Sequence, residues 1–251
     1  MSESRPTSAR REATRARLLD GARQVIADQG VHGASVEAIC EAAGFTRGAF
    51  YSNFTSRDDL VLAIIADDRA RALAEIESVL ADPPDDPGEI VAAIQERLAE
   101  FDSLRRHLVR TELTLYALRS PTVRPDFVRV RREFREGFRQ AIDAAAAAKG
   151  LTLLLDTELL VRAVEALHDG ATMQSLLEPD ALPFGTIQQE VIPRILLEHN
   201  DEDSSILDRE QSKRLMRADL SGPSMADKLI ADRRAEAQRE EQPRASADRA
   251  R

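Results

Sequence analysis

Arg47 and its neighbours have the side-chain types that proteins use to contact DNA. An arginine can donate two hydrogen bonds to a guanine edge, and Gly48, which lacks a side chain, would let the backbone come close to the bases. The hydroxyl groups of Thr46 and Tyr51 can bind phosphate, which positions a protein without reading the base sequence. The predicted DNA-binding residues of this region are Ser35, Thr46, Arg47, Gly48, Tyr51 and Ser52.

Residues that carry catalysis or bind metals do not form a recognisable group in the sequence. The four histidines have no His-x-x-x-His or His-Glu-x-x-His spacing, and the single cysteine excludes an internal disulfide or a zinc site built from several cysteines. No glycine-rich phosphate loop is present, and acidic pairs such as Asp58-Asp59 point apart on a helix. We therefore expect no enzyme activity, no metal and no cofactor. Cys40 lies on a predicted apolar helix face, which favours a core position over a redox sensor.

Two short capped helices are predicted to position the DNA-contacting residues. Ser35 is a good N-cap for a helix that ends at Gly44, and Thr46 can cap the helix that follows. Gly44 accepts the left-handed backbone conformation that a tight turn between two helices needs. The segment 35–54 is therefore predicted to be a helix-turn-helix, whose second helix enters the major groove of DNA.

The wider sequence resembles a known family. Ser35-Val-Glu-Ala-Ile-Cys-Glu-Ala-Ala-Gly-Phe-Thr-Arg-Gly-Ala-Phe-Tyr-Ser-Asn-Phe54, followed by Ser56-Arg-Asp-Asp-Leu60, is similar to the DNA-binding domain of the TetR family of bacterial regulators. The resemblance covers about residues 12–67. It implies a dimer whose subunits each have a three-helix DNA-binding head, a larger helical body and a fourth helix that links the two.

The same resemblance assigns roles to three further residues. The aromatic residue at the position of Tyr51 commonly contacts phosphate, as does the basic residue at the position of Arg57. The family more often has Lys at the latter position, and Arg keeps the charge but changes the geometry. The segment 163–180 resembles the penultimate helix through which these proteins often dimerise, so Gly170 is predicted to lie at a close helix crossing in the dimer interface.

Helical periodicity continues through most of the chain, which predicts an all-α fold. We expect a flexible basic arm at 1–11, the helix-turn-helix domain at 12–56, a helical ligand-binding and dimerisation body at 57–200, and a largely disordered charged tail at 201–251. The first helix is predicted at about Glu12–Gln29, and the linking helix at Arg57 to about Leu80. A role for the tail in docking on a partner remains an alternative.

The charge distribution agrees with a DNA-binding head. The formal net charge is −9, yet residues 1–24 hold six basic and three acidic residues, whereas 61–200 hold 16 basic and 24 acidic residues. A local basic patch beside the helix-turn-helix can attract DNA although the whole chain is acidic. The Arg-rich N-terminus lacks the apolar segment of a secretory signal, and no apolar run is long enough for a membrane span, so a cytoplasmic location without membrane association is expected.

The predicted helices in the middle of the chain carry more aromatic side chains than the last two helices do. A ligand pocket is therefore expected among these middle helices. Filling of the core by these rings remains the alternative. The predicted pocket residues are Phe101, Leu104, His107, Leu108, Glu112, Tyr116, Phe127, Val130, Phe134, His168 and Met173.

These observations predict a homodimeric repressor that binds a palindromic operator in double-stranded DNA and releases it when a small apolar effector enters the body. An activator or a ligand-independent regulator would have the same sequence features. A helical protein-interaction module without specific DNA binding is the alternative from a different class.

Overall fold

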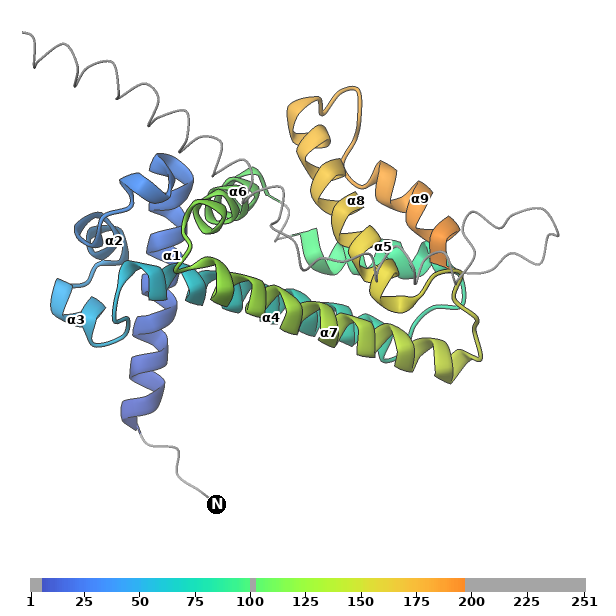
Figure 1. Ribbon diagram of the computed structural model, residues 1–251, viewed down its shortest axis with the longest axis horizontal. Coiled ribbons are helices and arrows are strands. Elements are labelled where there is room, and N and C mark those ends of the chain that lie inside the picture. The colour runs from blue at the N-terminus through green and yellow to red at the C-terminus, as the bar shows by residue number, and fades with distance from the viewer. Residues whose placement is uncertain (1–5, 100–102, 197–251) are drawn as a thin grey trace, which may run out of the picture. The chain divides into compact units, whose positions relative to one another are not determined.

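The computed structural model describes residues 6–99 and 103–196, and within these ranges the chain forms α-helices and no β-strand (Figure 1). The predicted all-α fold is therefore confirmed. The helices are α1 (Pro6–Gly33), α2 (Val36–Ala43), α3 (Arg47–Tyr51), α4 (Arg57–Leu80), α5 (Pro87–Leu98), α6 (Leu104–Arg119), α7 (Arg124–Lys149), α8 (Thr157–Leu177) and α9 (Thr186–Leu196).

Helix α1 begins earlier than predicted, whereas its regular part ends at Gly30, as predicted. It begins at Pro6 rather than at Glu12, because proline is well suited to the first position of a helix and the following residues allow the helix to continue. Part of the segment predicted to be a flexible arm is thus helical. At the other end, Gly30 has a φ of 71°, which breaks the regular helix where the sequence predicted its end, and a further turn follows.

Local hydrogen bonds explain where the helices begin and end. The side-chain oxygens of Ser56, Asp86 and Ser103 accept hydrogen bonds from backbone N–H groups in the first turns of α4, α5 and α6. Helix α7 ends at Gly150, whose φ of 63° allows its N–H group to reach carbonyl groups of the last turn. These signals are local in sequence, which is why the start of α4 at Arg57 could be predicted.

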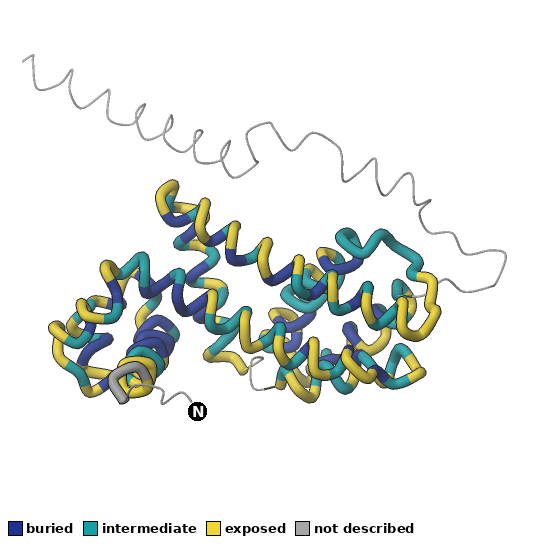
Figure 2. The backbone as a smooth tube through the Cα atoms, turned by 90° about the horizontal axis from the view of Figure 1, so that it is seen from below, coloured by how far each residue is buried: buried dark blue, intermediate teal, exposed yellow. Residues whose placement is uncertain are grey.

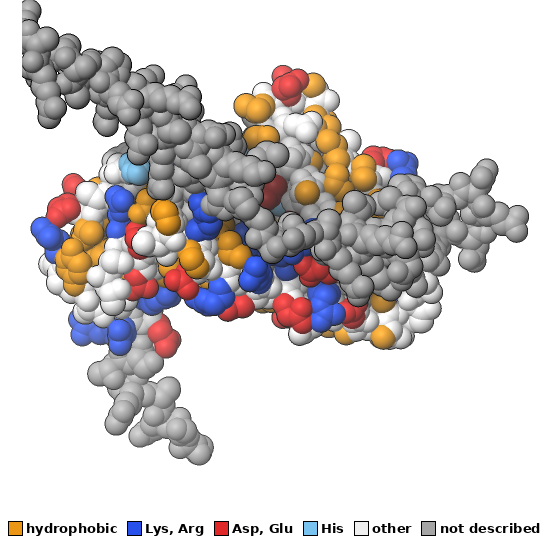
Figure 3. Space-filling model, in the orientation of Figure 1, with side chains coloured by type: hydrophobic (Ala, Val, Ile, Leu, Met, Phe, Trp, Pro, Cys, Tyr) orange, Lys and Arg blue, Asp and Glu red, His pale blue; other side chains and the backbone are white. Residues whose placement is uncertain are grey.

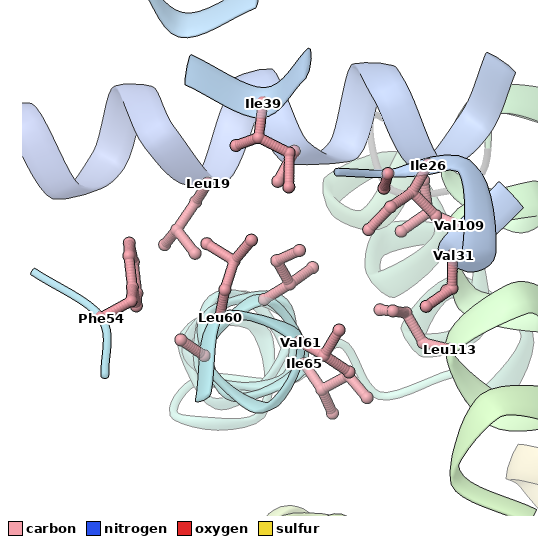
Figure 4. Packing of buried hydrophobic residues seen from close by; sticks show 14 of the residues in the cluster. Leu19, Ile26, Val31, Ile39, Phe54, Leu60, Val61, Ile65, Val109 and Leu113 are labelled. Carbon is pink, nitrogen blue, oxygen red and sulfur yellow. The ribbon is translucent and has the colours of Figure 1, made fainter. Parts of the chain in front are cut away.

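Two apolar clusters hold the described chain together. The first contains buried residues of α1, α2, α3 and the beginning of α4, together with residues of α6 and the beginning of α7 (Figure 4). The second lies between the end of α4, α7 and α8. Helix α4 contributes to both clusters, because its buried residues lie near its beginning, from Leu60 to Ile65, and near its end, at Ile76 and Leu80. Figure 2 shows how buried and exposed stretches alternate along the helices.

Helices α4 and α7 lie side by side and connect the head to the rest of the body (Figure 1). Gly137 on α7 allows this close packing, since a Cβ atom placed there would lie 2.5 Å from a methyl carbon of Leu73 on α4. A side chain at position 137 would therefore displace the Leu73 side chain.

Some of the sequence predictions concern residues that the structure does not describe. Phe101 and the segment 201–251 lie outside the described residues. The proposed division into arm, head, body and tail stays a prediction.

Candidate DNA-binding site and effector cavity

The segment between α2 and α3 has the geometry of a helix-turn-helix. The Ser35 hydroxyl accepts a hydrogen bond from the Ala38 N–H group at 3.1 Å, and the Thr46 hydroxyl accepts one from the Ala49 N–H group at 3.3 Å. Between the two helices Gly44 adopts a left-handed conformation with φ 71° and ψ 37°. The predicted caps and the predicted glycine turn are all present.

The residues predicted to contact DNA lie mostly on the exposed side of this motif. Tyr51 is 52% exposed although its ring also packs edge-to-face on Phe50. The guanidinium of Arg47 lies 2.8 Å from the carboxylate of Glu37 on α2, and both side chains are more than half exposed. Basic side chains are visible over this end of the head in Figure 3. The other exposed members of the predicted set are Ser35, Thr46, Gly48 and Ser52.

Arginines of α1 hold the helix-turn-helix in place, a role that the sequence analysis did not find. Arg11 donates a hydrogen bond to the Ser52 carbonyl at 3.1 Å, and Arg17 donates one to the Ala43 carbonyl at 3.1 Å. The guanidinium of Arg17 also lies 4.7 Å from the centre of the Phe45 ring. Part of the basic excess near the N-terminus therefore supports the motif directly, through contacts between residues far apart in sequence.

Gly21 is a second residue that sequence reasoning missed. A Cβ atom at this position would lie 2.9 Å from both the Cβ and the backbone nitrogen of Ala43, so α1 and α2 approach each other too closely for a side chain. The sequence does contain a signal for this contact. A glycine in the middle of a helix lowers the stability of the helix, so its presence there indicates that a neighbouring element leaves no room for a side chain.

Arg57 lies at the junction of head and body. Its guanidinium faces the Tyr116 ring of α6, 5.7 Å from the ring centre, and donates a long hydrogen bond of 3.5 Å to the Val31 carbonyl. Tyr116 donates a 2.6 Å hydrogen bond to Asp58, and burial raises the pKa of its phenol. Arg57 thus has partners within the protein, and its predicted contact with phosphate stays a prediction.

Glu112 also belongs to this junction. Its carboxylate accepts a hydrogen bond of 3.1 Å from the Val31 N–H group, directly after the break at Gly30. Both Glu112 and Tyr116 join α6 to the head, and neither lines the cavities described below, so their predicted role in a ligand pocket stays a prediction. Cys40 is buried in the head core, as the apolar face predicted, and burial raises the pKa of its thiol.

The body contains a largely apolar cavity of about 150 Å³ between α4, α5, α7, α8 and α9. Phe134 and His168 from the predicted pocket set line it. A smaller cavity of about 90 Å³ adjoins it, includes Phe127, and shares Arg69, Ala72 and Arg110 with the larger one. Helices α8 and α9 also contribute to the larger cavity, α8 in part through the predicted residue His168.

The other predicted pocket residues do not line the larger cavity. Leu104, Leu108 and Met173 are exposed, with 56%, 41% and 50% of their surface accessible. Val130 is buried in the core that contains the head, and His107 forms a hydrogen-bonded pair with Arg110. Apolar periodicity predicted which faces were buried but could not determine which helices would face one another.

Gln188 and Arg69 are the polar residues of this region that the sequence analysis missed. Gln188 on α9 is 2% exposed, and neither atom of its amide has a hydrogen-bond partner within the described residues. Such a group costs about 1–3 kcal/mol of folding free energy. The guanidinium of Arg69 lies 3.1 Å from Glu165 and 4.6 Å from the centre of the Phe134 ring.

Helix α8 carries an exposed apolar surface, visible as hydrophobic side chains over this helix in Figure 3. Leu177 is 74% exposed, and Phe184 in the turn after α8 is 42% exposed. A Cβ atom at Gly170, the predicted interface residue, would meet no atom of the described residues within 4 Å. A side chain could therefore be added at Gly170 without a clash inside the subunit.

The fold and the site define a class: all-α proteins with an N-terminal helix-turn-helix. Comparison with known proteins gives the family. The model for bacterial regulatory proteins of the tetR family matches residues 18–64, and the model for the C-terminal part of BetI-type transcriptional repressors matches residues 88–196. The chain belongs to the TetR family of transcriptional regulators.

Curated relatives match mainly in the head. The regulator UidR of Escherichia coli strain K12 is 41% identical over 63 residues, which is 25% of this chain and 32% of that protein. The repressor AcnR of Corynebacterium glutamicum is 39% identical over 74 residues, 30% of this chain and 36% of AcnR. The match thus spans about a third of the length of these relatives.

Solved structures agree over a larger part of the chain. GusR of Salmonella enterica has 24% sequence identity and a TM-score of 0.57, with 73% of this chain and 95% of GusR covered. FadR of Bacillus subtilis, crystallised in complex with stearoyl-CoA, has 15% identity and a TM-score of 0.58, with 73% and 97% covered. At these identities the likeness shows the fold. Within the described residues, no helix combines the length and apolar character that a membrane span requires.

Proposed function

We propose that this chain is a homodimeric repressor that binds a palindromic operator in double-stranded DNA. The observation that carries the proposal is the capped helix-turn-helix with Arg47 and Tyr51 exposed on its second helix. Arginines of α1 bind the carbonyl groups at the ends of α2 and α3, and the exposed side chains of α3 are free to enter the major groove. The similarity to BetI-type and AcnR repressors supports repression over activation.

The proposed DNA contacts divide into two kinds. Arg47 reads a base pair, and Gly48 lets the backbone approach the groove. The hydroxyl groups of Ser35, Thr46, Tyr51 and Ser52, together with Arg57, contact phosphate and fix the register of the head.

The proposed effector is a small molecule with a large apolar part that enters the body and changes the spacing of the two heads. A dimer reads two half-sites about 34–36 Å apart, so a change of this spacing weakens binding. Helix α4 belongs to both apolar clusters and connects the cavity to the head. The crystal structure of FadR with stearoyl-CoA shows that a protein of this fold can hold a ligand.

Footprinting of the purified full chain on the DNA upstream of its own gene tests the proposal. We expect a protected site with two-fold symmetry and an affinity that falls steeply with salt concentration. Equal affinity for random DNA would instead favour the alternative that the chain is a helical protein-interaction module without specific DNA binding. Deletion of the gene should raise expression from the protected promoter, and a decrease would identify an activator.

A further inference from the structure

The cavity of about 150 Å³ between α4, α5, α7, α8 and α9 has the size and the wall of a binding site for a small apolar group. Its apolar wall comes from residues such as Ile76, Leu80, Ile94, Phe138 and Ile192. An engineered cavity of about 150 Å³ with a similar lining in another protein binds benzene. The cavity described here has about the same volume, so it suits one aromatic ring or a short acyl chain.

Gln188 gives a reason to expect a polar group on the ligand. This residue lines the cavity and is almost completely buried, yet both its amide oxygen and its amide nitrogen lack partners in the described protein. Buried amides are nearly always hydrogen-bonded. Apolar neighbours on the same wall cannot supply a hydrogen bond, whereas a ligand oxygen can accept one from the amide nitrogen of Gln188.

Charged groups at one side of the cavity favour an anion. Arg69 and Arg110 both line the larger cavity and the smaller one beside it. Glu165 also lines the larger cavity, but its carboxylate is shared among three arginines: Arg69 at 3.1 Å, and Arg131 and Arg135 each at 3.3 Å. Asp169 lies 3.6 Å from Arg110.

Basic side chains therefore outnumber acidic ones around the two adjoining cavities. In the smaller cavity Asp68 faces Arg106, but Asp68 is also paired with Arg23 of α1. Burial lowers the pKa of Arg69, and the charges of Arg131 and Arg110 lower it further, while Glu165 and Asp169 raise it. An added anion would stabilise this group of arginines.

We infer that the cavity binds a small carboxylate whose apolar body has the size of one aromatic ring or a short acyl chain. The apolar body fills the space between α4, α5, α7 and α9, and the carboxylate faces Arg69 and Arg110. Gln188 donates a hydrogen bond to a ligand oxygen. This inference rests on the proposed function, since it names the chemical class of the effector.

Isothermal titration of the full chain with paired probes tests the inference without a mutation. The probes are 3-phenylpropionate and octanoate, each compared with its uncharged alcohol, 3-phenylpropanol and octanol. We expect each carboxylate to bind at least tenfold more tightly than its alcohol. Equal binding of acid and alcohol would overturn the anionic part, and absence of binding by all four would overturn the site.

Variants locate the binding site. Arg110→Gln should weaken carboxylate binding at least tenfold and leave alcohol binding unchanged, whereas Gln188→Leu should weaken both. Arg97→Gln is the matched control, because Arg97 is 60% exposed on α5 and lies outside the cavity wall. The inference fails if Arg110→Gln binds the carboxylates as tightly as Arg97→Gln does.

Footprinting of the same protein separates this inference from the proposed function. Protected DNA together with no carboxylate binding would overturn the effector class and leave the DNA-binding proposal intact. Carboxylate binding together with no protected DNA would overturn the proposed function and support the ligand site. Release of the DNA by 3-phenylpropionate or octanoate, but not by the alcohols, supports both.

Discussion

Arg47 is paired with Glu37 on the outer face of the helix-turn-helix, and this pair is exposed to solvent. Exposed ion pairs contribute only about 0–1 kcal/mol. DNA can therefore separate the two side chains at little cost and gain the hydrogen bonds of Arg47. In the absence of DNA, Glu37 holds the guanidinium of Arg47 against α2.

Arg47→Ala should reduce discrimination at one base pair of each half-site by about 1–3 kcal/mol, because the hydrogen bonds to the base edge are lost. Fluorescence anisotropy with the operator and with single-base variants measures the effect. Arg97→Ala is the control for loss of charge and should leave discrimination unchanged. An equal loss of affinity for all sequences would show that Arg47 contacts phosphate only.

Substitution by alanine should change the free energy of unfolding in opposite directions at Gly48 and Gly44. A Cβ atom at Gly48 meets only the Thr46 hydroxyl oxygen at 3.7 Å, so Gly48→Ala should raise the free energy of unfolding by up to about 1 kcal/mol. It should also weaken operator binding, because the methyl group keeps the backbone away from the bases. Gly44→Ala should lower the free energy of unfolding by about 1–2 kcal/mol, since its φ is 71°.

Urea unfolding and operator titration of both glycine variants make this comparison. Normal operator affinity of a stable Gly48→Ala variant would contradict close approach of the backbone.

Residues of the helix-turn-helix were predictable because their signals are local. The hydroxyl groups of Ser35 and Thr46 accept hydrogen bonds from N–H groups three positions later in the sequence. Gly44 forms the turn through its own left-handed backbone conformation. Arg17 and Gln188 were not predictable, because their roles depend on residues from other helices. A sequence shows that an arginine or a glutamine is present but not which cavity or carbonyl group it faces.

At the scale of helices, the contact between α1 and α2 depends on Gly21. Gly21→Ala should lower the free energy of unfolding by about 1 kcal/mol, because the overlap with Ala43 outweighs the better helix propensity of alanine. Urea unfolding followed by circular dichroism measures this change. Gly48→Ala is the control with room for the methyl group, and a similar increase in stability for both variants would contradict the close approach.

Helix positions were predicted better than helix partners. The linking helix was predicted at Arg57 to about Leu80 and is found there, because Ser56 and the Asp82-Pro-Pro segment mark its two ends. Helices α8 and α9 both form part of the cavity wall, whereas the predicted pocket residues Leu104 and Leu108 of α6 do not. Apolar spacing along one helix contains no information about the helix it will contact.

The whole molecule is proposed to be a dimer through α8. Gly170→Leu should shift the protein towards the monomer, because the added side chain meets open space within the subunit but would meet the partner in the dimer. Light scattering measures the mass. Arg97→Leu is the control, since it adds the same side chain at an exposed position of α5.

Removal of residues 201–251 should leave the protein a folded dimer with nearly unchanged affinity for the operator. A monomeric truncated protein would assign assembly to that segment. An unchanged dimer in Gly170→Leu would place the interface elsewhere.

The packing of α6 limits how this protein can be recombined with its relatives. Val109, Leu113 and Ala117 of α6 are buried in the same cluster as the helices of the head, and Glu112 binds the backbone after Gly30. A hybrid regulator that joins this head to a foreign body at α4 would leave that apolar surface without its own partner. Exchange of DNA specificity between family members therefore requires α6 to be transferred with the head, or its contact residues to be matched in the recipient.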